Sequence, residues 1–262
     1  MTFLPIVERE LRVAARRRST YFGRVGGAVV AMIVGGWMML AMQNQSPGQL
    51  GKVLFILLSV LLFVYSLAAG ARITADCLSE EKREGTLGLL FLTDLKRYDI
   101  VSGKLVANSV NTFYGLLAAF PVLAISLLMG GVTSGEFWRV ALVATNLLFF
   151  SLSVGMFASA VSRDERKALS LAFFILLIVL GTTPAIELGL NLTNQNHASS
   201  PFWLKPSPAF ACFTAFGSHG GFGGFKPSDF WPTVLLTHIY GWIFLIMASV
   251  IVPRSWQDKV TK

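Results

Sequence analysis

Long uncharged, apolar runs alternate with short polar segments along the 262-residue chain. An α-helix rises about 1.5 Å per residue, so roughly 20 apolar residues are needed to cross the hydrocarbon core of a bilayer. Six runs approach or exceed this length. They are Val25–Met42, Val53–Ala71, Leu105–Met129, Phe137–Val161, Ala168–Leu190 and Pro232–Val252. The pattern therefore predicts an all-α, polytopic membrane protein with six transmembrane helices in a single membrane domain, residues 1–262.

The composition agrees with this prediction, because 54% of the residues are hydrophobic and only 14% are charged. Soluble domains have roughly 25% charged residues, and disordered chains have low hydrophobicity. Within the predicted spans, Arg139 and Glu187 lie within a turn of a span end. Charges at mid-membrane mark ion and proton pathways. The spans therefore argue against an ion-coupled pump or a voltage sensor.

The formal net charge of +8 indicates orientation rather than nucleic-acid binding. With six spans, both termini lie on one face together with the links 72–104 and 162–167. This face carries 18 of the 22 Lys and Arg residues, and the outer face and its borders carry the other four. Positive residues concentrate on the cytoplasmic side of membrane proteins. Both the leader, residues 1–24, and the tail, residues 253–262, are therefore predicted to be cytoplasmic.

The leader would place Phe3, Val7 and Leu11 on one face of a helix and Arg9 and Arg12 on the other. This pattern predicts an amphipathic helix along the inner leaflet, and the alternative is a polybasic flank that only sets topology.

Small residues recur at four-residue spacing in the fourth span, at Ser151, Gly155 and Ser159. Such spacing lets helices approach closely, either inside one bundle, which is the simpler interpretation, or at a dimer seam.

The link 72–104 is the most informative stretch. Its charged run, 80–84, suits an exposed extension of the second span, and Gly85 is typical of the residue that ends a helix. Thr86 is a candidate N-cap for a short helix, Leu87 to Leu92, whose apolar side chains need cover. That cover is either the inner leaflet and the leader, or a groove on another protein.

The same link carries an ordered series of motif residues. They are Asp76, Glu81, Glu84, Gly85, Thr86, Leu87, Leu89, Leu90, Thr93, Leu95, Arg97, Ile100, Val101, Gly103 and Lys104. The series resembles the segment after the second span in type 2 ABC exporter permeases, whose usual form is an acidic-rich helix, E-x-G-T-L, leucines, T-P-L-S-R and G-K. Asp94 stands where that family usually has proline. An amphipathic elbow helix at the amino terminus, six spans and a long outer loop, residues 191–231, extend the resemblance to most of the chain.

The resemblance implies the permease subunit of an ATP-binding-cassette exporter in a bacterial inner membrane. In that family the segment is a coupling helix that docks into a cleft of a separate ABC ATPase subunit. The implied contact residues here are Glu84, Gly85, Thr86, Leu87, Leu89, Leu90 and Phe91. Two permeases, as a homodimer or a heterodimer, would move an unidentified substrate by alternating access.

ATP hydrolysis needs a phosphate loop of the form G-x-x-x-x-G-K-[ST]. Gly103-Lys104 and Gly51-Lys52 both lack the first glycine and the final hydroxyl residue. ATP and Mg²⁺ are therefore expected on the partner subunit, and this chain is expected to bind no cofactor and to catalyse no reaction.

The outer loop is rich in glycine and aromatic residues, which predicts a flexible or partly re-entrant cap rather than a ligand site. His197 and His219 lie in this loop without a metal-ligand spacing.

Four polar residues inside the spans are candidates for a substrate path: Asn108, Asn111, Thr112 and Asn146. The alternative is hydrogen bonding between helices, which is also the expectation for His238. A rival function for the whole chain is a membrane anchor or assembly factor that recruits a soluble partner through the link 72–104 and transports nothing.

Overall fold

The computed structural model describes residues 46–85, 97–193, 205–216 and 227–255, together with scattered positions between 26 and 40. Seven α-helices and one short 3₁₀ helix have their bounds within the four continuous ranges, the scattered positions between 26 and 40 are also helical, and no strand occurs among the described residues. The bounded helices are α3 (Pro47–Ala75), α4 (Ser79–Glu84), α6 (Arg97–Leu128), α7 (Ser134–Val161), α8 (Glu165–Thr193), α9 (Pro208–Ala215), η2 (Pro227–Asp229) and α10 (Phe230–Ser255). The predicted all-α class is confirmed for this part of the chain.

Within the described part of the chain, four stretches are long and apolar enough to cross a membrane: Pro47–Glu84, Tyr98–Leu128, Ser134–Val161 and Phe230–Pro253. They contain the predicted second, third, fourth and sixth spans almost completely. The predicted fifth span, 168–190, lies within α8, and its crossing of the membrane stays a prediction. The leader and most of the first span lie outside the described residues, so the elbow helix and the count of six also stay predictions.

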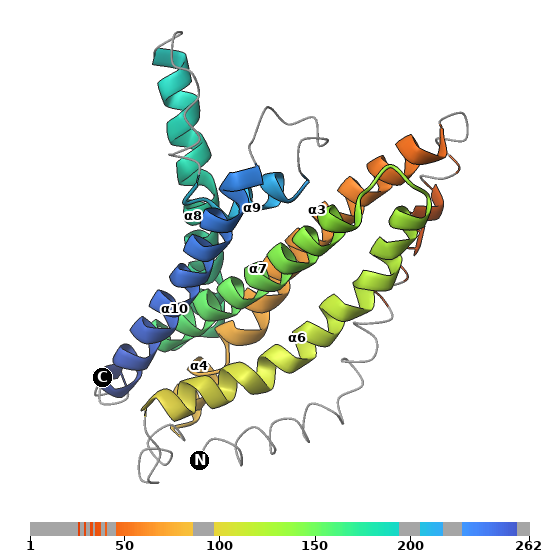
Figure 1. Cartoon of the computed structure of the whole chain (residues 1–262). Coiled ribbons are helices and arrows are strands. Elements are labelled where there is room, and N and C mark those ends of the chain that lie inside the picture. The colour runs from red at the N-terminus through yellow and green to blue at the C-terminus, as the bar shows by residue number, and fades with distance from the viewer. Residues whose placement is uncertain are drawn as a thin grey trace.

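Helix α7 is the centre of the bundle and contacts α3, α6, α8, α9 and α10 (Figure 1). Its start is fixed by a capping box, in which Glu136 N donates to Thr133 Oγ1 and Thr133 N donates to Glu136 Oε2 at 2.8 Å. Two glycines with positive φ, Gly130 and Gly131, form the turn from α6 into this cap. Small side chains then let neighbours approach α7 from several sides, so most of the helix is buried.

The two ends of the bundle differ. At one end, hereafter the α4 end, lie α4, the start of α6 and the carboxyl ends of α7 and α10 (Figure 1). At the opposite, α9 end, the short helix α9 packs on α7 and α10, with Ser207 as its N-cap. The ion pair between Lys205 Nζ and Asp229 Oδ1, at 3.0 Å, joins the segments on either side of residues 217–226. Part of the predicted outer loop is thus a buried helix.

Candidate functional site

The chain breaks its helix at the α4 end, directly before the link that carries the family motif. Helix α3 ends at Ala75, and α4 begins at Ser79 after a turn in which Leu78 is completely buried. Gly85 then ends α4 with φ of 71°, in the left-handed region that favours glycine. The predicted end at Gly85 is confirmed.

The predicted exposed extension of the second span is wrong in two respects. The helix is interrupted between Ala75 and Ser79, where Leu78 is completely buried and the Ser159 side chain replaces the missing intrahelical acceptors. Of the five charged residues in the run 80–84, Glu80, Arg83 and Glu84 are exposed, whereas Glu81 and Lys82 are partly buried.

Ser159 of α7 fills the break. Its Oγ accepts hydrogen bonds from the backbone N–H groups of Leu78 and Ser79, each at 2.9 Å. These are donors that the interrupted helix leaves without an intrahelical acceptor. Lys82 Nζ donates to the carbonyl oxygens of Ser159 and Ala160. Helix α4 is therefore fastened to the carboxyl end of α7.

A largely buried ion pair fastens α4 to α6. Lys104 Nζ lies 2.8 Å from Glu81 Oε1, with side-chain exposures of 11% and 19%. The same ammonium donates to the carbonyl of Cys77 at 2.8 Å, and Asn108 Nδ2, one turn further along α6, lies 3.0 Å from Cys77 Sγ. A charge removed from water needs such partners, since its desolvation costs several kcal/mol.

The outer side of the turn is closed by Asp76. Its carboxylate accepts from Ser79 Oγ at 2.8 Å and pairs with Arg83 at 3.0 Å. Together, Ser159, Glu81, Lys104 and Asp76 form what we call the junction. It holds α4, the start of α6 and the end of α7 as one unit at the two flanks of residues 86–96.

Of the predicted ATPase contacts, Glu84 and Gly85 are exposed at the end of α4. Thr86, Leu87, Leu89, Leu90 and Phe91 lie outside the described residues, as do His197 and His219 in the outer loop. The contact with an ATPase therefore stays a prediction.

The path candidates whose side chains the structure describes make different contacts. Asn108 lies beside the junction, with its Nδ2 3.0 Å from Cys77 Sγ. Thr112 is buried and donates to the Asn108 carbonyl, and the side chain of Asn111 is not among those described. Asn146 joins α7 to α10, donating to the Val234 carbonyl at 2.9 Å and lying 3.0 Å from His238 Nδ1. The interhelical bonding that was the alternative is thus observed for Asn146 and His238, and a substrate path through the four stays a prediction.

Among the described residues, no group of three or more His, Cys, Asp or Glu side chains could hold a metal ion.

Sequence reasoning did not identify Ser159 and Lys104 as partners of α4. Two sequence features could have indicated these roles. Ser159 belongs to the small-residue series on α7, and Lys104 stands directly before an apolar run.

The sequence matches the family described as ABC-2 family transporter protein over residues 6–253. This is nearly the whole chain, and the chain therefore belongs to that family, as its resemblance to type 2 ABC exporter permeases predicted. It is a permease component of an ABC transporter and a multi-pass membrane protein. No protein of curated function matches it.

Replacing Ser159 with alanine is expected to destabilise the junction. The Leu78 and Ser79 N–H groups would lose their acceptor, and each unsatisfied buried donor costs about 1–3 kcal/mol. Ser153, on the same helix and equally buried, donates only to the Phe149 carbonyl of its own helix. S153A is therefore the matched control, and thermal unfolding in detergent should show a clearly lower midpoint for S159A than for S153A. Equal midpoints would contradict the assigned role.

Proposed function

We propose that this chain is the membrane subunit of an ATP-driven exporter, and that residues 84–92 receive the movement of a separate ABC ATPase. ATP and Mg²⁺ are bound by that ATPase. The α4 end faces the cytoplasm of a bacterial cell, and two permeases, identical or different, enclose one path with two ATPase subunits. The substrate crosses by alternating access.

The junction is the observation that supports this proposal most directly. A docked segment transmits force only if its flanks are held rigidly to the membrane helices. Here the amino-terminal flank is held by Ser159 and the two flanks are tied to each other by the Glu81–Lys104 pair. Movement of the segment would thus reach α3, α6 and α7 together.

The apolar segment itself provides the docking test. A charged side chain at Leu90, as in L90E, or a side chain at Gly85, as in G85V, is expected to abolish co-purification of the ATPase encoded beside or co-expressed with the permease. Gly85 requires glycine because its φ is positive, and a glutamate in an apolar groove is desolvated without a partner.

The matched control is L128E, because Leu128 is an exposed leucine at the opposite, α9 end of α6. All three variants should insert into the membrane, and L128E should keep the ATPase. Retention of the ATPase by L90E and G85V would overturn the docking assignment. If the ATPase binds but reconstituted vesicles show no ATP-dependent substrate movement and no substrate-stimulated ATP turnover, the anchor function is correct instead.

A further inference from the structure

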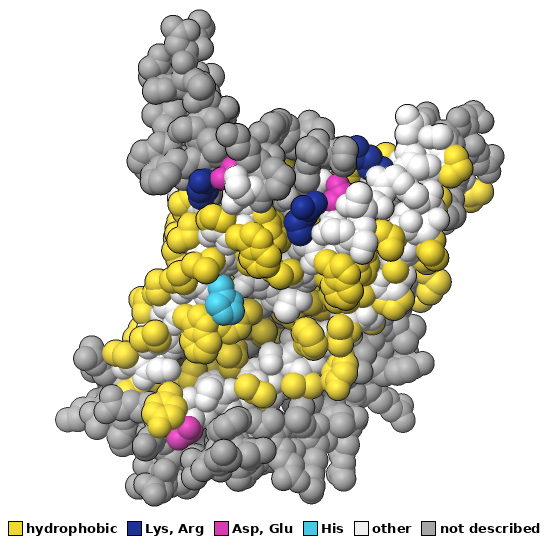
Figure 2. All heavy atoms as spheres, in the orientation of Figure 1, with side chains coloured by type: hydrophobic (Ala, Val, Ile, Leu, Met, Phe, Trp, Pro, Cys, Tyr) yellow, Lys and Arg dark blue, Asp and Glu magenta, His cyan; other side chains and the backbone are white. Residues whose placement is uncertain are grey.

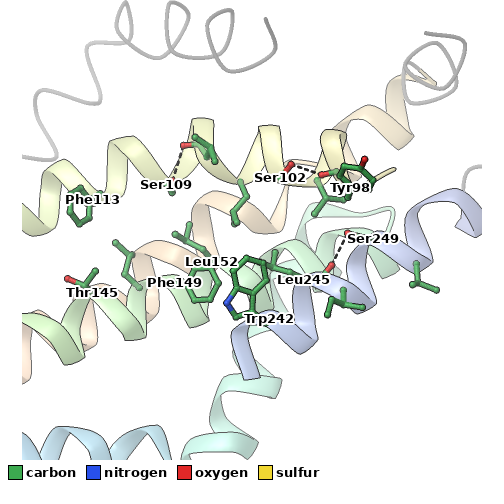
Figure 3. A pocket seen from close by; sticks show the side chains of 16 residues that line it. Tyr98, Ser102, Ser109, Phe113, Thr145, Phe149, Leu152, Trp242, Leu245 and Ser249 are labelled. Carbon is green, nitrogen blue, oxygen red and sulfur yellow. Dashed lines mark hydrogen bonds between the residues drawn. The ribbon is translucent and has the colours of Figure 1, made fainter. Parts of the chain in front are cut away.

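A cavity of about 670 Å³ lies between α6, α7 and α10 in the half of the bundle nearer the α4 end (Figure 3). Tyr98 and Val250 line it at the α4 end, and Phe113 and Thr145 line it toward the middle of the bundle. Of the candidate path residues whose side chains are described, Asn108, Thr112 and Asn146 do not border it. It is thus a separate feature from the predicted substrate path and from the junction.

The lining offers almost only carbon to an occupant. The serine and threonine hydroxyl groups that border it are used within their own helices: Ser102 donates to the Tyr98 carbonyl, Ser109 to the Val106 carbonyl, Thr145 to the Ala141 carbonyl and Ser249 to the Leu245 carbonyl. A polar ligand would lose its hydrogen bonds to water and gain none here. A hydrocarbon chain makes no hydrogen bonds to water, so it loses none when it enters the cavity.

The cavity opens on a surface that faces the hydrocarbon region. Val106, Ile246 and Val250 line it and are exposed, and Figure 2 shows hydrophobic side chains across much of this face. In a bilayer, such a surface meets acyl chains rather than water. Whatever enters from this side therefore comes from the lipid.

The length of the cavity fits one leaflet. From Tyr98 to Phe113 the lining follows 15 residue steps of α6, or roughly 22 Å at about 1.5 Å each. Half of the hydrocarbon core is about 15 Å thick, and the headgroup layer adds several more. The lining thus extends from headgroup depth at Tyr98, whose phenol suits that level, to just beyond the bilayer centre.

Phe149 and Trp242 line the middle of the cavity, between Tyr98 and Phe113, and His238 contacts both of them (Figure 3). Trp242 Nε1 donates to His238 Nε2 at 3.1 Å, the imidazole stacks on Phe149 at 4.9 Å, and His238 Nδ1 lies 3.0 Å from Asn146 Oδ1. Since Nε2 accepts from the indole, Nδ1 carries the proton and donates to Asn146. These contacts hold the middle of the lining in one arrangement.

From these observations we infer that the cavity binds one acyl chain of a glycerophospholipid from the leaflet at the α4 end, with its headgroup beside Tyr98. The apolar lining, the lateral opening and the length all fit this occupant. The site is independent of the proposed coupling to an ATPase.

Filling the cavity tests the inference. S249W places an indole in it, whereas I243W adds the same side chain to an exposed position of α10 that does not border it. After purification in a mild detergent, native mass spectrometry should find about one retained phospholipid per chain for the wild type and I243W, and at least fivefold less for S249W. Equal retention by S249W, or none by the wild type, would overturn the site.

A second measurement covers the case in which S249W folds poorly. In vesicles containing phospholipid with brominated acyl chains, the wild type should lose more fluorescence than W242F, because bromine beside Trp242 quenches its emission. No difference between the two proteins would overturn the inference.

A second copy of the chain is the competing occupant, and it is tested with I246C. Disulfide-linked dimers formed in the membrane through this cysteine would show that the opening faces protein, and would overturn the lipid assignment. Cys212 contributes little background, because burial raises the pKa of its thiol to about 12 and the reactive thiolate is absent at neutral pH.

Discussion

Valine at position 155 is expected to prevent α3 and α7 from packing and to remove most of the folded protein. A Cβ on Gly155 would overlap Thr74 Oγ1 and lie 2.9 Å from the Ala71 carbonyl oxygen, which is backbone and cannot rotate away. Inserting methyl groups into a packed core costs about 1–3 kcal/mol and occasionally more. Here the axes of α3 and α7 must separate, so we expect the free energy of unfolding to fall by about 3 kcal/mol or more.

The control for this substitution is G181V. Gly181 is also inside a helix, but a Cβ there meets no atom within 4 Å. The two variants therefore share the same change in helix propensity and differ only in the atoms that the new side chain meets. Size-exclusion profiles and thermal unfolding in detergent should show a large loss for G155V and a small one for G181V. A G155V protein as stable as G181V would contradict the close crossing.

The close crossing explains why a simple sequence pattern predicted part of the core. Ser151 Oγ donates to the Ser66 carbonyl at 2.7 Å, and Thr74 Oγ1 donates to the Leu152 carbonyl at 3.0 Å. Only helices whose backbones nearly touch can exchange such bonds. The small-residue series Ser151, Gly155 and Ser159 therefore packs within the bundle, on the side occupied by α3 and α4.

The spans were predictable because a bilayer admits few structures. A run of about 20 apolar residues can satisfy its backbone only as a helix, and the predicted span 137–161 differs from α7, Ser134–Val161, only in its first turn. Helix α9 was not predicted. Its eight residues are too few for a periodic pattern, and its burial depends on α7 and α10.

The site was predictable where the signal is local. Gly85 ends α4 because a left-handed residue is needed directly after the last helical turn, and that requirement is visible in the sequence. Ser159 and Leu78 are far apart along the chain, and no property of either residue indicates the other. The cavity depends on the angle between α6 and α10, which side-chain packing sets.

The Glu81–Lys104 pair is expected to matter most for transport. K104M would leave Glu81 with its charge largely out of water and would remove the donor to the Cys77 carbonyl. Breaking a buried pair from one side costs about 3–5 kcal/mol, and the residual exposure of 11% and 19% places this pair toward the lower value. If the pair ties the two flanks of the docking segment together, K104M should still bind the ATPase.

Substrate transport and its coupling to ATP turnover should nevertheless fall at least tenfold in reconstituted K104M vesicles. The double variant E81M/K104M should recover thermal stability, since an apolar pair needs no charge partner. K167M is the control, because Lys167 lies at the same 2.8 Å from Asp164 but with side-chain exposures of 78% and 56%, where such pairs contribute little. Unimpaired transport in K104M would show that the ion pair stabilises the fold without transmitting movement, and loss of ATPase binding would place Lys104 in docking instead.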